Sequence, residues 1–348
     1  MQALLPRERV AAALEFRAPD VIPVRIYPAP GGLHEHGRTL VDLIQACGHD
    51  FGDLGWVRVP DPPRPEDVDP DGSYHAFRTD DWGTRWEFRI FGVWGHPVAW
   101  PLDDLGQIET YRFPPAAPAA GPALERAQAQ GAELRRTYFH LEGATSLLEK
   151  MISLRRFEDV LIDVAEDAPA INRLADRLTE YSLTWVQRAL AVGADAVSFG
   201  DDFGTTQAPL FSPQVWRRFF KPRYAALVAP IRRAGKRAFL HSCGQVGPLL
   251  EDFAEIGFSA IWPQLPLFAP RDLAQRCRQL GLAVELHPDR GELMQHGSPA
   301  QVRDYVRRVV DECGSAGGGS WLYLEVDPHF PYPNVAALFE TTMKLRGC

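Results

Sequence analysis

The sequence is poor in cysteine and has no long run of apolar residues. Its five cysteines are scattered among 348 residues, at Cys47, Cys243, Cys277, Cys313 and Cys348. This odd number at wide spacing is no disulfide framework and is typical of a reducing compartment. No stretch approaches the roughly 20 uncharged apolar residues that span a bilayer, and the charged residues 7–9 interrupt any signal-peptide pattern. We therefore expect a cytoplasmic protein that is not embedded in a membrane.

An excess of basic charge is also missing. The chain carries 37 Lys and Arg against 45 Asp and Glu, for a formal net charge of −8. Such a balance gives no general positive field for nucleic acid or an anionic membrane. A chain of this length, 45% hydrophobic, can bury a large core without a structural metal. A bound metal is therefore expected to serve chemistry.

A regular alternation of short apolar runs and amphipathic helical stretches begins near residue 134. The expected strands are 21–27, 134–140, 196–200, 237–241, 259–262, 282–286 and 320–325. The expected helices are 6–16, 146–156, 168–192, 213–234, 248–256, 270–280, 299–313 and 334–346. Strand-then-helix order indicates parallel strands with crossover helices. One more strand would make eight, so we predict an α/β fold, a (β/α)8 TIM barrel, in a single domain over 1–348.

The region from about residue 28 to 120 breaks this alternation. It is rich in Pro, Gly and Trp and shows little helical periodicity. We predict long loops here, a small antiparallel excursion around residues 84–93, and an exposed connector at 114–122. The eighth strand is expected within this region. No G-x-G-x-x-G follows a strand, which argues against a dinucleotide-binding doubly wound sheet.

Polar residues follow the ends of the expected strands. In a TIM barrel, functional side chains come from these positions and the loops after them. The set comprises His140 and Glu142, Asp201 and Asp202, His241 and Cys243, Gln264, His287 and Asp289, then Glu325, Asp327 and His329. A polar residue at the start of a loop is often simply exposed to water, which would explain any single member of the set. It explains the repetition at the ends of successive strands less well.

His241-Ser242-Cys243 is the sharpest motif. Imidazole and thiolate are common zinc ligands, and two residues separated by one at a strand end can point to the same side. A catalytic zinc needs a third protein ligand and one open position. Glu325, at the end of the last strand, is the best candidate, with Asp327 and His329 in reserve. The alternative is a buried histidine beside a structural cysteine.

Asp201-Asp202 has the form of a paired-carboxylate site. It could bind substrate, support a zinc-bound histidine, or act in general acid–base chemistry. A turn or helix-start role would account for at least one of the two.

Ordered segments along nearly the whole chain resemble the uroporphyrinogen decarboxylase superfamily, and within it the cobalamin-dependent methyltransferase branch. The segments are 7–10 with 19–24, 81–86, 154–161, 200–205, 212–216, 241–244, 297–302 and 331–335. Of these, Gly200-Asp201-Asp202-Phe203-Gly204-Thr205 resembles the mid-chain signature. His241-Ser242-Cys243-Gly244 resembles the metal motif. The resemblance implies a TIM barrel and a zinc site.

Two departures from the family pattern refine this expectation. Uroporphyrinogen decarboxylases carry an arginine-rich stretch near the first strand, whereas residues 27–34 contain no arginine, so a decarboxylase or lyase acting without metal is the weaker alternative. Coenzyme M methyltransferases place a second zinc cysteine at the last strand, where this chain has Glu325. Cys277, Cys313 and Cys348 lie in or next to expected helices and do not fit. A His/Cys/Glu site is harder than a His/Cys/Cys site and favours activation of oxygen.

The resemblance thus implies a zinc-dependent methyltransferase that moves a methyl group from a small methylated substrate to a corrinoid carrier protein. An aryl methyl ether, cleaved by O-demethylation, would suit the aromatic loops that contain Trp56, Trp82, Trp86, Trp94, Trp100 and Trp262. Asp201, Asp202 and His140 would position the substrate or supply a proton. The corrinoid is expected on a partner, because the chain lacks the Asp-x-His-x-x-Gly motif of corrinoid carriers. A methylcobamide:thiol methyltransferase and a non-catalytic binding protein are two further candidate functions.

Overall fold

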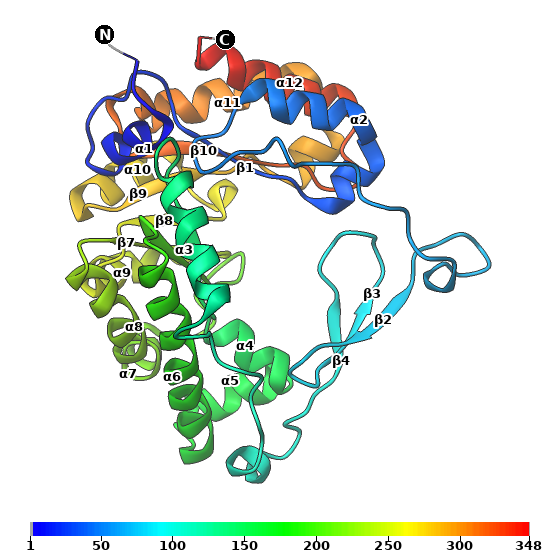
Figure 1. Ribbon diagram of the computed structural model, residues 1–348, viewed down its shortest axis with the longest axis vertical. Coiled ribbons are helices and arrows are strands. Elements are labelled where there is room, and N and C mark those ends of the chain that lie inside the picture. The colour runs from blue at the N-terminus through cyan, green and yellow to red at the C-terminus, as the bar shows by residue number, and fades with distance from the viewer. Residues whose placement is uncertain (1–2, 348) are drawn as a thin grey trace.

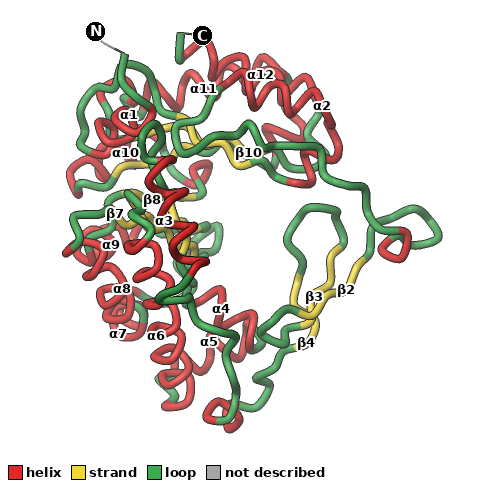
Figure 2. Tube along the Cα trace, in the orientation of Figure 1, coloured by secondary structure: helices red, strands yellow, loops and turns green. Residues whose placement is uncertain are grey.

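The computed structural model describes residues 3–347, so that Cys348 lies outside the described residues. Seven parallel strands form one curled sheet in the order β1-β10-β9-β8-β7-β6-β5, and three strands form a separate antiparallel sheet, β2-β3-β4 (Figures 1 and 2). The parallel strands are β1 (Val24–Tyr27), β5 (Leu141–Gly143), β6 (Ala196–Gly200), β7 (Arg237–Ser242), β8 (Ala260–Pro263), β9 (Ala283–Leu286) and β10 (Ser320–Glu325). The antiparallel strands are β2 (Ala76–Thr79), β3 (Arg85–Phe88) and β4 (His96–Ala99).

Helices connect successive parallel strands and cover the outside of the sheet (Figure 1). They are α1 (Pro6–Leu14), α2 (Pro30–Cys47), α3 (Pro122–Leu134), α4 (Leu148–Leu154), α5 (Phe157–Ala165), α6 (Pro169–Ala191), α7 (Pro213–Phe219), α8 (Lys221–Arg233), α9 (Leu250–Ile256), α10 (Pro270–Leu280), α11 (Pro299–Glu312) and α12 (Tyr332–Leu345). Many begin with proline in the first turn, where its missing N–H costs nothing. Within residues 3–347, no helix is both long and apolar enough to cross a membrane.

Within the described part of the chain, the eighth strand of the predicted barrel is not formed, and the sheet is a seven-stranded, barrel-like one. A short segment at Asp50 takes the missing position by single backbone hydrogen bonds. The Asp50 N–H donates to the Val24 carbonyl at 2.9 Å, and the Phe139 N–H donates to the Asp50 carbonyl at 3.0 Å. The Asp50 carboxylate is fully buried and accepts from Arg9, Arg346 and the Val24 N–H. Buried ionic and backbone bonds therefore replace a strand ladder between β1 and β5.

Two local predictions were wrong. The expected strand at 134–140 is the end of α3 followed by a turn, and β5 begins only at Leu141. The 18-residue helix α2 was missed, because Pro30, Gly31 and Gly32 are poor helix formers. Gly31 and Gly32 instead allow close packing: an added Cβ would lie 2.5 Å from the Pro328 side chain and 2.0 Å from the Val326 carbonyl oxygen, respectively.

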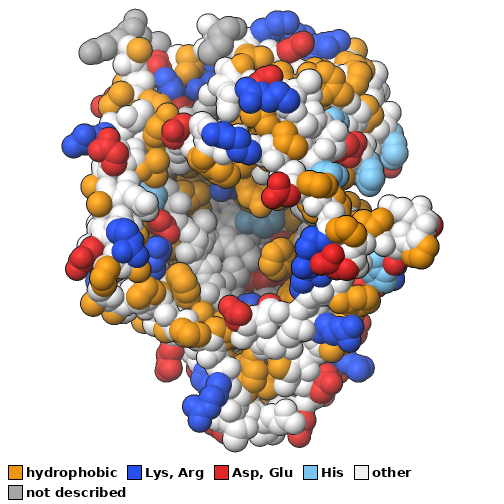
Figure 3. Space-filling view, turned by 45° about the vertical axis from the view of Figure 1, so that its right-hand side comes forward, with side chains coloured by type: hydrophobic (Ala, Val, Ile, Leu, Met, Phe, Trp, Pro, Cys, Tyr) orange, Lys and Arg blue, Asp and Glu red, His pale blue; other side chains and the backbone are white. Residues whose placement is uncertain are grey.

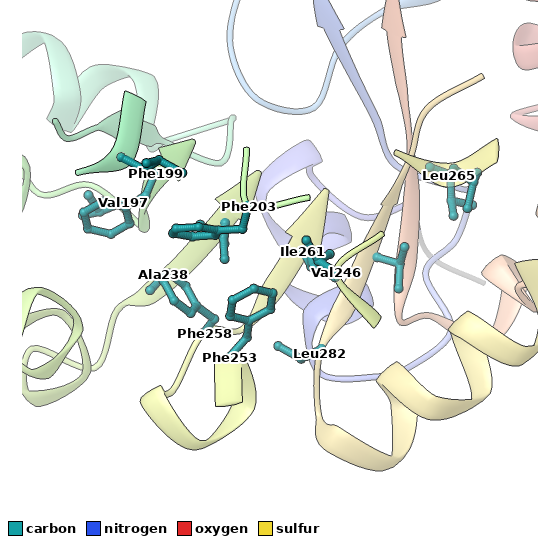
Figure 4. Packing of buried hydrophobic residues seen from close by; sticks show 14 of the residues in the cluster. Val197, Phe199, Phe203, Ala238, Val246, Phe253, Phe258, Ile261, Leu265 and Leu282 are labelled. Carbon is teal, nitrogen blue, oxygen red and sulfur yellow. The ribbon is translucent and has the colours of Figure 1, made fainter. Parts of the chain in front are cut away.

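Side chains alternate between the inside of the curled sheet and its helix-covered outside. The inside holds a small cluster that includes Phe139, Phe239 and Trp321. Outside, a larger cluster fills the layer between strands and helices, and Figure 4 shows part of it, with Val197, Phe203 and Ala238 labelled among others. The carboxyl ends of the strands open on one face, where the space-filling view shows a hollow with hydrophobic side chains on its rim (Figure 3).

Candidate metal centre and active site

Strand β7 carries the His-x-Cys motif to the mouth of the curled sheet. Phe239, two residues before His241, belongs to the inside cluster. The two-residue period of a strand therefore directs His241 and then Cys243 to the same inner side. Pairing with the neighbouring strands sets His241 between Gly200 of β6 and Trp262 of β8.

Asp202, His241 and Cys243 form a compact group of possible metal ligands, with one donor atom of each within 4.8 Å of the others. The Cys243 Sγ lies 3.5 Å from His241 Nε2, which is 3.4 Å from Asp202 Oδ1. The Cys243 backbone N–H donates to the same Asp202 oxygen at 2.8 Å. Nitrogen, thiolate sulfur and carboxylate oxygen are the donor types of protein zinc sites, so the residues present fit a zinc ion.

The orientation of His241 suits metal binding. Its Nδ1–H donates to the Trp262 carbonyl at 3.0 Å, and its ring centre lies 3.9 Å from that of the Trp262 ring. This leaves the Nε2 lone pair directed at Cys243 and Asp202, as in zinc sites whose second nitrogen is held by an outer partner. Burial lowers the pKa of His241 and favours the neutral imidazole that a metal needs.

Cys243 is less well suited to ionise by itself. Burial, and then the charge of Asp202, raise the pKa of the Cys243 thiol to about 12. A thiolate at this place therefore needs a nearby cation, which a metal ion would supply.

Two glycines hold the loops after β6 and β7 together. Gly244 has φ +84°, and an added Cβ there would lie 2.0 Å from the Gly204 carbonyl carbon. The Gly204 N–H donates to the Cys243 carbonyl at 3.2 Å. This backbone contact fixes the distance between Asp202 on one loop and Cys243 on the other.

Asp201 and Asp202 have separate environments. Asp201 is fully buried and accepts hydrogen bonds from the Leu147, Leu148 and Glu149 N–H groups at the start of α4, and from the Tyr224 hydroxyl. Burial raises its pKa to about 6, although these hydrogen bonds act in the opposite direction. Asp201 therefore anchors α4 beneath the mouth, while Asp202 faces the motif.

His140 is not brought to the mouth. Its Nε2 lies 2.9 Å from Glu142 Oε1, and Glu142 also pairs with Arg188 of α6 at 3.2 Å. An added Cβ on Gly131 of α3 would lie 3.0 Å from the His140 ring. His140 and Glu142 thus face the helical layer.

Glu325 lies near the mouth but outside the three-residue group. Its carboxylate accepts from the Tyr323 hydroxyl at 3.1 Å and pairs with Arg290 at 3.4 Å and His287 at 3.8 Å. Asp327 pairs with Arg290 at 2.5 Å.

His329 is largely exposed, and its backbone N–H donates to Glu35 at 2.6 Å. The expected third ligands, Glu325, Asp327 and His329, are not grouped with His241 and Cys243. Asp202, which was expected to bind substrate or to support the site, is placed beside them instead.

Three residues of the site were not singled out in the sequence. Glu149 of α4 accepts the Asp202 N–H at 3.4 Å, and burial, then Asp201 and Asp202, raise its pKa to about 7. Arg25 of β1 and Glu285 of β9 form a two-bond ion pair inside the sheet, at 2.6 and 2.7 Å. Arg25 and Glu285 could have been found from the sequence, because each is a charged residue inside an otherwise apolar expected strand. No such signal marked Glu149.

Two cavities meet at His241 and Trp262. One, of about 280 Å³, extends inward along β6, β7 and β8 to Phe239 and Trp321. The other, of about 270 Å³, lies between Cys243 and the loop after β9 that carries His287 and Arg290. A small organic molecule could therefore reach the group of possible ligands from either side.

Residues 136–345 match the uroporphyrinogen decarboxylase (URO-D) family, more than half of the chain. A methylcobamide:CoM methyltransferase, MtaA, from Methanosarcina barkeri is 26% identical over 121 residues, which are 35% of this chain and 33% of the relative. A second MtaA, from the strain Fusaro of that species, is 24% identical over 121 residues, with the same coverage of both chains. The chain thus matches about a third of the length of these curated relatives.

A solved structure of a methyltransferase from Methanosarcina mazei shares the fold along almost the whole chain. Its TM-score is 0.64 at 16% sequence identity, and the alignment covers 98% of this chain and 99% of that one. The chain belongs to the uroporphyrinogen decarboxylase family, and its similarity within that family is to the corrinoid methyltransferase branch.

Proposed function

We propose that the protein is a zinc-dependent methyltransferase that moves a methyl group from a small methylated substrate to a corrinoid held by a partner protein. The observation that carries this proposal is the convergence of Asp202, His241 and Cys243 at the mouth of the sheet. The curated relatives support it, since they are named as methyltransferases that use a methylcobamide.

In this proposal, His241, Cys243 and Asp202 hold the zinc and leave a position for substrate. Zinc when bound would act as a Lewis acid toward the atom that loses the methyl group. One sulfur donor with one carboxylate makes a harder site than two thiolates, which favours an oxygen leaving group. Glu325 acts from outside this ligand set by orienting Arg290 and His287.

An aryl methyl ether is the proposed substrate class, and O-demethylation the reaction. Trp262 supports this choice because its ring lines both cavities and contacts His241. Asp201 and His140 have structural roles in this proposal, since neither carboxylate nor imidazole faces the mouth. The corrinoid partner would approach the open face shown in Figure 3.

The proposal is tested with purified protein, a methoxylated aromatic compound and cob(I)alamin, by following methylcobalamin formation spectroscopically. Zinc-loaded protein should transfer the methyl group, and chelator-treated protein should not until zinc is restored. Cys243→Ala should lose both zinc and transfer. Cys313→Ala is the matched control, because Cys313 follows α11 and is remote from the motif; it should retain both.

Two other functions give different results. If no methylcobalamin forms and the protein instead releases carbon dioxide from a carboxylated substrate, at a rate that Cys243→Ala and the chelator leave unchanged, a metal-independent decarboxylase or lyase is favoured. If zinc is bound but the methyl group moves only from methylcobalamin to a thiol, the protein acts as a methylcobamide:thiol methyltransferase, as the name of the Methanosarcina barkeri relative suggests.

A further inference from the structure

The inward cavity beside His241 exists because its β5 and β6 side is built from very small residues. Gly143, Ala144, Ser198 and Gly200 line this side. At Gly143, an added Cβ would meet nothing within 4 Å. The volume of about 280 Å³ exceeds the roughly 150 Å³ that suffices for benzene in an engineered protein cavity. One aromatic ring with small substituents therefore matches its size.

The opposite wall contains one buried ion pair. Arg25 donates to Glu285 through Nε at 2.6 Å and Nη2 at 2.7 Å. Trp321 Nε1 donates to the same carboxylate at 2.7 Å, so the Glu285 carboxylate accepts three hydrogen bonds from within the protein. Among residues 3–347, nothing accepts a hydrogen bond from Arg25 Nη1, so this group can donate to a ligand.

Arg25 is held rigidly by aromatic rings. Its guanidinium lies 4.5 Å from the Tyr323 ring centre and 5.4 Å from that of Trp262. The Trp262 ring centre is also only 3.9 Å from that of His241, so this ring neighbours both the free Arg25 donor and the metal ligand His241. A flat molecule against Trp262 could thus reach both groups.

The ion pair disfavours ligands of either charge. An anion would meet the Glu285 carboxylate and an arginine that is already paired, and would lose its hydration on entry. A cation would meet Arg25, which already occupies the aromatic faces that would otherwise attract it. A neutral molecule avoids both costs.

We propose that this cavity binds a neutral, single-ring methoxyarene, with Arg25 donating a hydrogen bond to a second oxygen on the ring. The inference rests on the proposed function for the orientation of the methoxy oxygen toward His241. The rejection of charged analogues depends only on the cavity. Arg25 is then a specificity-determining residue, and Glu285 is the positioning residue that neutralises it.

The test compares three probes of similar size, 4-methoxyphenol, 4-methoxybenzoate and (4-methoxyphenyl)trimethylammonium, by calorimetry and tryptophan fluorescence at pH 7. Both zinc-loaded and metal-free protein are titrated, so that binding is read apart from zinc content and methyl transfer. Binding of 4-methoxyphenol at least ten times tighter than either charged probe is expected. Equal or tighter binding of a charged probe would overturn the proposal.

Two variants locate the binding. Gly143→Leu should fill the cavity and weaken 4-methoxyphenol binding at least tenfold with zinc content unchanged. Gly317→Leu is the matched control. Gly317 is exposed, also has no atoms within 4 Å of an added Cβ, and lies before the amino end of β10, away from the mouth of the sheet. This variant should bind 4-methoxyphenol as the wild type does. Unchanged binding in Gly143→Leu would place the ligand elsewhere and refute the inference.

Glu285→Gln tests the charge argument separately. It leaves Arg25 without its carboxylate, so 4-methoxybenzoate should bind at least ten times tighter than to the wild type. If its affinity does not rise in folded protein, Arg25 does not face the ligand. A wild-type protein that binds no zinc or transfers no methyl group, but still prefers 4-methoxyphenol to the two charged probes, would instead count against the proposed function alone.

Discussion

Replacement of Asp50 by asparagine should destabilise the protein because this carboxylate closes the sheet. Asp50 is fully buried and accepts from Arg9 Nη1 at 2.5 Å, Arg346 Nη1 at 2.6 Å and the Val24 N–H at 2.7 Å. Asp50→Asn keeps the volume but removes the negative charge shared by two arginines. Arg9 keeps its second partner, Asp20, at 2.8 Å.

The size of the effect follows from the burial of the network. Breaking a buried ion pair by removing one partner costs about 3–5 kcal/mol, because the other charge remains buried. An unfolding entropy of about 2.1 cal/mol/K per residue, applied to 348 residues, converts this loss into a fall in Tm of about 4–7 °C.

Differential scanning calorimetry measures this shift. Asp42→Asn is the control, because Asp42 pairs with Arg38 on the surface of α2, with both side chains more than half exposed. That pair is worth about 0.5 kcal/mol at most, so its Tm should fall by less than about 1 °C. Equal shifts in the two variants would refute the view that Asp50 replaces the missing strand.

Two other variants test the Arg9 network and the glycine contact. Hydrogen bonding to Arg9 lowers the pKa of Asp20 to about 2, so Asp20→Asn should cost about 2 kcal/mol near neutral pH. Since the folded pKa is depressed, this difference should disappear as the pH falls from about 4 toward 2; a difference that grows in acid would contradict the assignment. Gly244→Ala should weaken zinc binding by about 10–100-fold, judged by competition with a chelator, because it separates the loops at Gly204. Gly235 has a similar φ of +68° but open space around it, so Gly235→Ala should lower the stability of the fold and leave zinc binding unchanged. Equal losses of zinc in the two variants would instead mean that backbone strain causes the loss in Gly244→Ala.

The sequence predicted those parts of the fold that depend on local patterns. Strands β6 to β10 are apolar runs between clear helices, and the expected ranges agree with the structure within a residue or two. The antiparallel excursion was also expected. Helix α2 was missed because its glycines serve contacts with residues almost 300 positions away, which no local pattern reveals.

The candidate site also contains residues that a local pattern reveals and residues that only contacts between distant segments bring together. His241 and Cys243 could be singled out because both lie on one strand. The position of Asp202 depends on the contact between two loops, so strand order alone favoured Glu325 instead. The Arg25–Glu285 pair joins residues 260 positions apart and could not be inferred from either strand alone.

X-ray absorption at the zinc edge, with metal analysis of the same samples, tests the proposed metal centre most directly. We predict about one zinc per chain, with a single sulfur near 2.3 Å and lighter N or O ligands near 2.0–2.1 Å. Asp202→Ala should lose zinc affinity, whereas Glu325→Gln should retain it. Three results would contradict a centre built from Asp202, His241 and Cys243. They are two sulfur ligands at the zinc, zinc that is retained in Asp202→Ala but lost in Glu325→Gln, and a wild-type protein without stoichiometric zinc.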